Sequence, residues 1–159
     1  MRPLSILKHL ILAAAGLAAI ALPLLPLRAH AEPFAGPVPA HVTDVIDGDT
    51  VKVEARIWLD QSIVTTVRLA EIDAPEIGAH AHCTSERDKA DAAKAYLETL
   101  VADRDVTLRE IKNDKYGGRV DARVVLADGR DVSDLMLAKH LANPYGGGRK
   151  TPWCGLAAD

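Results

Sequence analysis

A β-hairpin with carboxylates at its open end is the feature that most constrains how this chain can fold. Apolar and β-branched residues predict strands at 51–58 and 63–72, joined by a turn at 59–62. VIDGDT precedes the first strand, and VRLAEIDAPE overlaps the end of the second. Antiparallel pairing about the centre of the turn places Asp49 opposite Ile72–Asp73, so we expect two carboxylates to lie side by side.

The charged residues at the open end of this hairpin fit one kind of chemistry. Carboxylates as close as Asp49 and Asp73 repel each other unless a cation lies between them, and oxygen-only sites select hard ions such as Ca²⁺ or Mg²⁺. Arg68 can grip phosphate oxygens bidentately, and Glu76 lies nearby in sequence. The set therefore suggests phosphodiester chemistry. Strict alternation puts Arg68 and Asp73 on opposite strand faces, so we expect a bend or bulge near residues 73–75.

Each segment also has an ordinary structural interpretation. Asp-Gly is a common hairpin-turn dipeptide, so DGDT alone indicates a turn. Asp-Ala-Pro-Glu alone is typical of a strand end followed by a proline stop. Only the two segments together, at this spacing and with Arg68 between them, indicate a functional site.

Residues 1–31 have the pattern of a secretory signal peptide. A basic start is followed by an almost wholly apolar run at 10–27 and by the small-x-small cleavage pattern Ala29-His30-Ala31. A transmembrane anchor is the alternative, but two prolines in the run and the missing positive flank argue against it. No cysteine follows the run, which argues against a lipid anchor. We expect a periplasmic or secreted protein, beginning near Glu32, without a stable membrane anchor.

The charge balance restricts the class of protein. Without Arg2, Lys8 and Arg28 of the leader, 16 basic and 22 acidic side chains remain, a net charge of −6. This balance argues against a high-affinity nucleic-acid-binding module, which relies on a basic face. An enzyme remains compatible, because a metal ion and two or three arginines can hold one phosphate locally. The remaining chain, about 128 residues, suffices for one domain with a modest core.

Cys83 and Cys154 are the two cysteines, and in an exported chain a disulfide is their simplest interpretation. Closing so long a loop stabilises a fold by about 4 kcal/mol in the chain-entropy estimate. One alternative is a zinc site formed with His80 and His82, although the spacing fits no common ligand pattern. The other alternative is a pair of free thiols.

The rest of the chain predicts short strands and two helices. An alanine and leucine stripe predicts a helix at 86–101 capped by Ser85, and we expect a second, short helix that is capped by Ser133 and extends to Leu141. The other expected elements are an extended lead-in at 32–40, strands at 41–47, 105–112 and 119–126, a loop at 78–84 and an irregular tail from Asn143. Residues 41–159 therefore form an α+β, mainly β domain: a five-stranded antiparallel OB-fold barrel with two packed helices.

A third motif, NDKYGGR at residues 113–119, is typical of a glycine-rich hairpin turn. Together with DGDTVKV, VRLAEIDAPE and ADGRDVSDLML it resembles the staphylococcal nuclease (thermonuclease) family, with the motifs in order over residues 42–145. The resemblance is to an exported bacterial member. It implies a Ca²⁺-dependent endonuclease in which water attacks phosphodiester bonds of DNA and RNA and leaves a 3′-phosphate.

The resemblance also implies roles for individual residues. Asp49 and Asp73 would bind Ca²⁺ through carboxylate oxygens, and Ala74, where the family has threonine, through its backbone carbonyl. Glu76 would orient or deprotonate the attacking water, while Asp47 would shape the turn. The positions that match nucleotide contacts of the family are Lys115, Tyr116 and Tyr145.

Arg68 and Arg119 would clamp the phosphate. The family has one glycine before the second arginine and this chain has two, so we expect Gly117 and Gly118 to absorb the extra residue as a bulge. A short tail, TPWCGLAAD, replaces the basic C-terminal helical extension of the family.

The sequence thus predicts a monomeric exported nuclease that acts on nucleic acid, preferentially single-stranded. One alternative is a non-catalytic nuclease-like module that binds single strands or a protein partner. The complete set of two metal-binding carboxylates, two arginines and a glutamate argues against it. The other alternative is an exported domain stapled by zinc or a disulfide and without any site, which metal analysis of the purified protein would separate from the calcium site.

Overall fold

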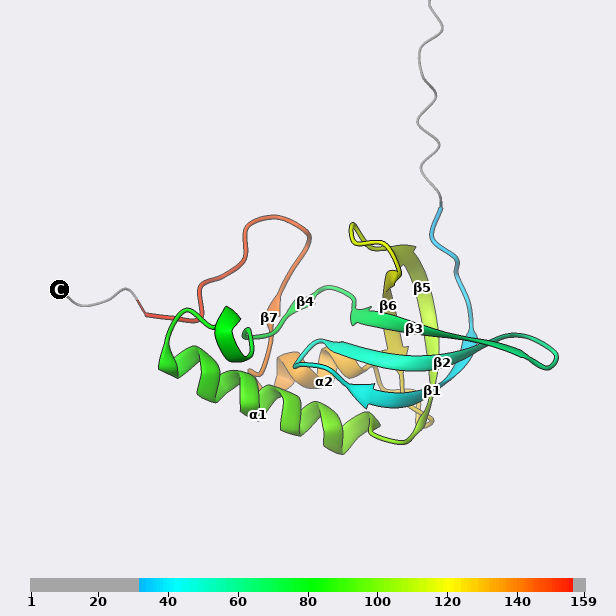
Figure 1. Cartoon of the computed structure of the whole chain (residues 1–159), viewed down its shortest axis with the longest axis horizontal. Helices are drawn as coiled ribbons and strands as arrows, with labels where there is room; N and C mark the ends of the chain where they lie inside the picture. Colours follow the sequence, from blue (N-terminus) through cyan, green and yellow to red (C-terminus); the bar gives the residue numbers. More distant parts are fainter. Residues whose placement is uncertain (1–31, 156–159) are drawn as a thin grey trace, which may run out of the picture. The chain divides into compact units, whose positions relative to one another are not determined.

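The protein is represented by a computed structural model that describes residues 32–155 (Figure 1). The predicted signal peptide, residues 1–31, lies outside the described residues. Five strands close into a barrel in the order β1-β2-β3-β6-β5. They are β1 (Val38–Val45), β2 (Thr50–Trp58), β3 (Gln61–Leu69), β5 (Asp105–Asn113) and β6 (Arg119–Val125). Neighbouring strands are antiparallel except β3 and β6, which pair in parallel, so the fully antiparallel barrel of the sequence prediction is wrong at this seam.

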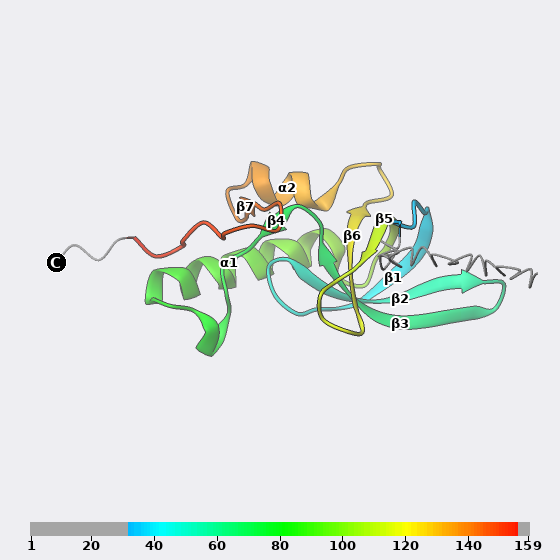
Figure 2. The same cartoon turned by 90° about the horizontal axis from the view of Figure 1, so that it is seen from above.

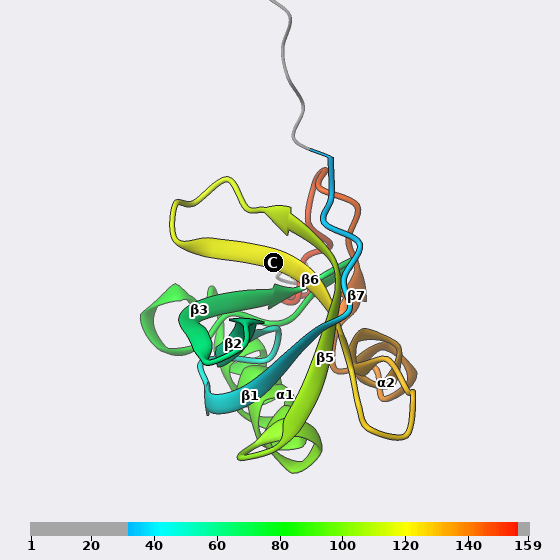
Figure 3. The same ribbon diagram turned by 90° about the vertical axis from the view of Figure 1, so that its right-hand side faces the viewer.

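The barrel forms because alternate positions of each strand carry apolar side chains, most of them small or β-branched, which face the interior. Figure 3 shows the strands enclosing this core, with helix α2 (Val132–Ala138) lying outside them. The fully buried strand residues of the barrel include Val42, Val51, Val53, Val67, Leu69, Leu108, Ala122 and Val124. The predicted five-stranded OB-type barrel with two helices is confirmed.

Helix α1 (Thr84–Val101) buries one stripe of small and branched residues, Ala90, Ala93, Leu97 and Val101. Both helices lie toward the end of the barrel opposite the tip of the β2–β3 hairpin (Figure 2). Each predicted cap is wrong by two residues. Cys83 caps α1 in place of Ser85, and Asp131 caps α2 in place of Ser133, because its carboxylate accepts from the backbone N–H groups of Ser133 and Asp134.

The β2–β3 hairpin has a different register from the predicted one. Its turn is only two residues long, Leu59–Asp60, and Thr50 pairs with Arg68. Asp49 therefore lies opposite Leu69, whose N–H donates to the Asp49 carbonyl at 2.8 Å. The predicted pairing of Asp49 with Ile72–Asp73 is wrong, because a shorter turn shifts every cross-strand partner.

A break after β3 brings the carboxylates together instead. The chain turns at Ala70 and Glu71, with Glu71 in the left-handed region at φ 66°. The next strand, β4 (Ile72–Asp73), pairs with β7 (Asn143–Pro144) in a separate two-stranded sheet. The expected bend exists, but it precedes Asp73. The tail from Asn143 is also not wholly irregular, since β7 holds its start.

The segment between β4 and α1 contains one turn of 3-10 helix, Gly78–His80, where the sequence predicts only a loop. Cys83 at its end is joined to Cys154 by a disulfide. A disulfide offers no thiolate to zinc, so the zinc alternative does not fit this structure. Within residues 32–155, neither helix has the length and apolar character needed to cross a bilayer.

Candidate active site

A cleft of about 730 Å³ opens beside the open end of the β2–β3 hairpin, away from its turn. Its walls come from the turn after β1, the β3–β4 segment, the β5–β6 loop and the tail after β7. Asp73 is buried beneath it and contacts its residues. The predicted site residues that line it are Asp49, Arg68, Ala74, Glu76, Lys115, Tyr116, Arg119 and Tyr145. Segments that are distant in sequence therefore converge on one cleft.

Arg68 bridges the two predicted metal ligands. One terminal nitrogen of its guanidinium donates to Asp49 Oδ1 at 2.8 Å, and the other donates to Asp73 Oδ1 at 3.2 Å. The second nitrogen also donates to the carbonyl of Ile72 at 3.3 Å. The Asp49 and Asp73 side chains are only 5% and 2% exposed. The proximity predicted from the sequence is thus present, with an arginine between the carboxylates.

The Asp49 carboxylate is held by its neighbours. Thr50 Oγ1 donates to Asp49 Oδ1 at 2.9 Å, and the Ala74 N–H donates to Asp49 Oδ2 at 2.8 Å. Asp47 accepts the N–H of Asp49 at 2.9 Å, which is the turn-shaping contact expected of it. Gly48 is required between them, because a Cβ there would lie 2.7 Å from the Cβ of Ala93 in α1. The glycine lets α1 pack directly under the site.

Burial of these charged groups shifts their pKa values. Desolvation raises the pKa of Asp49 to about 7, although the positive charge of Arg68 opposes the rise. Burial by itself lowers the pKa of Arg68, but Asp49 and Asp73 outweigh it, so the Arg68 pKa is raised overall. A divalent cation beside Asp49 would favour its ionised form.

Lys150 is a site residue that the sequence did not reveal. Its ammonium lies 2.8 Å from Asp73 Oδ1 and 2.7 Å from Glu76 Oε1. Burial lowers the pKa of Lys150, but hydrogen bonds to Asp73 and Glu76 outweigh that effect and raise it above its usual range. Lys150 lies 74 residues from Glu76, and only the disulfide between Cys83 and Cys154 hinted that the tail returns to this region.

The donor set fits a hard divalent cation. Asp49, Asp73 and Glu76 offer carboxylate oxygens, the ligands that Ca²⁺ prefers. The ammonium of Lys150 stands in for a cation between two of them. A further carboxylate, Asp121, lies beside Arg68 in the β3–β6 register and lines the cleft.

Asp121 also escaped the sequence analysis. Its Oδ1 is buried and has no hydrogen-bond partner within residues 32–155. Burial raises the pKa of Asp121, and the nearby charge of Asp114 adds to the rise. Unsatisfied buried carboxylate oxygens are rare in folded proteins. This group therefore adds to the excess of negative charge that a cation would relieve.

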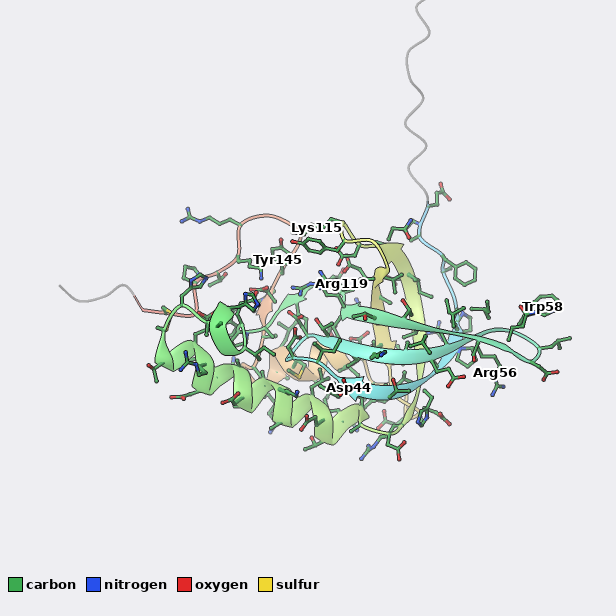
Figure 4. The ribbon with its side chains drawn as sticks, viewed as in Figure 1. Asp44, Arg56, Trp58, Lys115, Arg119 and Tyr145 are labelled. Atoms are coloured by element: carbon green, nitrogen blue, oxygen red, sulfur yellow. A yellow bond between two sulfur atoms is a disulfide. The ribbon has the colours of Figure 1, made fainter. Side chains whose placement is uncertain are left out.

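Arg119, the second arginine predicted to bind the phosphate, is the first residue of β6 and lines the cleft. Its Nε donates to Asp114 Oδ2, and its guanidinium carbon lies 5.0 Å from the ring centroid of Tyr116. The Nζ of Lys115 lies 5.0 Å from the same centroid. Figure 4 shows Lys115, Arg119 and Tyr145 grouped on one side, far from Trp58 at the hairpin tip. An exposed aromatic ring with two cations close to it is a surface on which a nucleobase can stack.

The two-glycine insertion is accommodated in the loop itself. Gly118 has φ 81°, which favours glycine. The register shift lies in β5 between Arg109 and Lys112, with Glu110 at φ 52°, rather than at the glycines. The predicted bulge is therefore misplaced, while Arg119 still lines the cleft.

Glu76 is positioned from below by a buried carboxylate. The Glu86 side chain, 3% exposed as a residue, accepts the N–H of Glu76 at 3.3 Å and that of His82 at 2.7 Å. In the sequence, Glu86 is only the first residue of the predicted helix at 86–101. The structure shows that it also fixes the loop that carries Glu76.

A comparison with protein families identifies the chain's relatives. The family model described as staphylococcal nuclease homologue matches residues 66–151. The matched segment runs from β3 to the tail, and so includes Arg68, Asp73, Glu76, Arg119 and Lys150. No curated protein matches the chain.

Proposed function

This chain belongs to the staphylococcal nuclease homologue family, and we propose that it is an exported nuclease that hydrolyses phosphodiester bonds of DNA and RNA with the help of Ca²⁺. The observation that carries the proposal is the position of Arg68 between buried Asp49 and Asp73, in a cleft that Glu76 and Arg119 also line. Export, to the periplasm or the medium, rests on the signal-peptide pattern of residues 1–31.

The roles of the residues follow from their chemistry. Asp49, Asp73 and the carbonyl of Ala74 would hold Ca²⁺, which supplies Lewis-acid stabilisation of the phosphate charge when bound. Glu76 has a side chain 42% exposed at the cleft, where its carboxylate can orient a water molecule and accept its proton. The backbone contact with Glu86 limits how far Glu76 can move.

Two arginines provide electrostatic stabilisation. Arg68 and Arg119 line the same cleft from adjacent strands, so that a phosphate between them would meet two guanidinium groups. The contact between Arg119 and Asp114 uses Nε, which leaves the terminal nitrogens for phosphate oxygens. Preorganised donors of this kind lower the barrier because they are already directed at the charge that develops in the transition state.

The cleft favours single strands as substrates. Tyr116 and Tyr145 line it together with Lys115, and unpaired bases can stack on such rings. The chain outside the leader carries a net charge of −6, so affinity has to come from these local groups rather than from a basic face.

The test is an activity assay of the purified mature protein on single-stranded DNA and RNA, with Ca²⁺ and with chelator. We expect cleavage that requires Ca²⁺ and stops on chelation. Cleavage that resists chelation would contradict the metal-assisted mechanism. Binding of single strands without cleavage at any Ca²⁺ concentration would favour the non-catalytic module instead.

A further inference from the structure

The tail after β7 forms a strap across the cleft, comprising residues 145–154. At its start, the N–H of Tyr145 donates to the carbonyl of Glu71 at 2.8 Å. At its end, Cys154 is bonded to Cys83, and Lys89 Nζ donates to the carbonyl of Trp153 at 3.2 Å. Figure 1 shows the strap arching from β7 to the beginning of α1. It is therefore tied to the domain at both ends.

The strap places one positively charged side chain in the site. Lys150 places its ammonium between Asp73 Oδ1 and Glu76 Oε1, at 2.8 and 2.7 Å. Asp73 is 2% exposed, so this contact differs from an ordinary surface ion pair, which contributes little. A cation bound by the Asp73 carboxylate would lie close to the ammonium of Lys150, so the two positive charges would repel each other.

The strap also contains the means to move Lys150 away. Gly146, Gly147 and Gly148 precede it, and a Cβ at any of them would meet no atom within 4 Å. Glycine permits a wide range of backbone angles, and Gly147 already has φ 87°. This run can change conformation while Cys154 remains bonded, so the ammonium can leave Asp73 without release of the tail.

We propose that Lys150 is the resident counter-cation of the metal site, and that its displacement sets the affinity of the site for Ca²⁺. The disulfide keeps the ammonium near the carboxylates and so raises its effective concentration there. The inference rests on the proposed function, because it takes the carboxylates to be the metal ligands. It adds a residue that determines metal affinity and a covalent tie that controls that residue.

The first experiment measures Ca²⁺ binding to the mature protein by titration calorimetry without substrate. We expect Lys150→Ala to lower the Kd for Ca²⁺ about tenfold, the ratio for one lost charge-assisted contact that the metal no longer has to break. Arg149→Ala is the matched control. Arg149 is an exposed cation next to Lys150 with no ion-pair partner within residues 32–155, so we expect its Kd to remain within about twofold of the wild type.

A second readout does not depend on calorimetry. Without metal, Lys150→Ala leaves Asp73 and Glu76 without their shared ammonium, so we expect a lower Tm than in Arg149→Ala. Added Ca²⁺ should then raise the Tm of Lys150→Ala by more than it raises the Tm of the wild type, because ligands stabilise the folded state according to their affinity.

The disulfide is tested with the double variant Cys83→Ser/Cys154→Ser, alone and combined with Lys150→Ala. Freeing the strap should tighten Ca²⁺ binding when Lys150 is present and should have no further effect when it is absent. Equal effects in both backgrounds would show that the disulfide acts through the fold rather than through Lys150.

The outcomes separate this inference from the proposed function. Equal Ca²⁺ affinity of wild type and Lys150→Ala, with clear binding in both, would overturn the inference and leave the nuclease proposal intact. Tighter binding in Lys150→Ala without cleavage of any nucleic acid would support the inference and contradict the nuclease proposal. Absence of Ca²⁺ binding in all variants would overturn both.

Discussion

Two arginine–carboxylate clusters on the same barrel make an instructive comparison. Arg68 lies between Asp49 and Asp73, whose side chains are almost completely buried. Arg123 contacts Glu71 at 2.8 Å, Asp131 at 2.9 Å and Asp134 at 3.7 Å. Glu71 and Asp134 are 64% and 69% exposed, so water solvates the excess negative charge of the second cluster.

The buried member of the Arg123 cluster has a structural task. Asp131 caps α2 by accepting the N–H of Ser133 at 2.8 Å, so its charge is compensated by backbone donors as well as by Arg123. The Arg68 cluster has Asp121 and Glu76 beside it and opens into a cleft. Surplus negative charge destabilises a protein little where water solvates it, but strongly where it is buried. The Arg68 cluster therefore fits a cation-binding site, whereas the Arg123 cluster fits a structural link between α2 and the barrel.

The largest expected effect tests the buried cluster. Asp49→Asn should reduce hydrolysis of single-stranded DNA by a factor of roughly 10³ or more, because it removes a charged metal ligand. Its counterpart in the exposed cluster, Asp134→Asn, should leave the rate unchanged. Single-turnover rates at saturating Ca²⁺ measure both. Similar losses of hydrolysis rate in the two variants would show that the buried and exposed clusters do not differ in function.

The same variant has a predicted effect on stability. Burial raises the pKa of Asp49 to about 7 from the unfolded value of 3.8, so the folded state loses stability as the pH rises between these values. Above that window the ionised carboxylate is unfavourable without metal. Asp49→Asn should therefore not lower the metal-free Tm at a pH of about 8. A large fall in Tm would show that Asp49 is held mainly for structure.

Arg119 sharpens the comparison because its side chain has the same 25% exposure as that of Arg123, but it lines the cleft. Arg119→Ala should lower the catalytic rate by on the order of 10², the scale for loss of one preorganised donor. Lys115→Ala should chiefly weaken substrate binding, since an ammonium cannot bridge two phosphate oxygens as a guanidinium can. Measurement of kcat and KM for both variants distinguishes the catalytic role of Arg119 from the binding role of Lys115. Near-normal turnover of Arg119→Ala would show that the two-glycine loop has displaced the clamp.

A substitution in the Arg123 cluster should lower the stability of the fold rather than the activity. Arg123→Ala leaves Asp131 with its capping contacts but without its cation, so we expect a loss of roughly 1–3 kcal/mol in the free energy of unfolding. Urea denaturation measures this loss. Activity per folded molecule should remain normal, and a selective loss of activity would mean that this cluster also contributes to the site.

The smallest effect is expected at a surface cluster, in which both carboxylates are exposed and the histidine is partly exposed. His41 Nδ1 lies 2.9 Å from Asp105 and Nε2 lies 3.1 Å from Asp103, and these hydrogen bonds raise the pKa of His41 above 6.5. The protonated ring thus stabilises the fold below the unfolded pKa, and this contribution is lost as the pH rises through the folded pKa. The Tm difference between wild type and His41→Gln should be larger at pH about 5.5 than at about 8.5. An equal difference at both values would exclude a charge effect.

The sequence predicted the grouping of the site better than its geometry. Spacing and residue chemistry brought Asp49, Asp73 and Arg68 together, although the predicted strand register was wrong. Leu59–Asp60 is not a recognisable hairpin turn, so its length could not be inferred. The proximity depends instead on the break at Ala70 and Glu71, which local propensity does not indicate.

What the sequence determined by itself is therefore the mainly β domain with two helices, the family resemblance and the identity of the acidic and basic groups at the hairpin. These follow from periodicity and local motifs, which short-range interactions dictate. Only the tertiary structure decided the parallel β3–β6 seam, the orphaned oxygen of Asp121 and the arrival of Lys150 between Asp73 and Glu76. Those features depend on contacts between residues far apart in the chain, whose partners are selected by packing of the whole domain and by the Cys83–Cys154 bond.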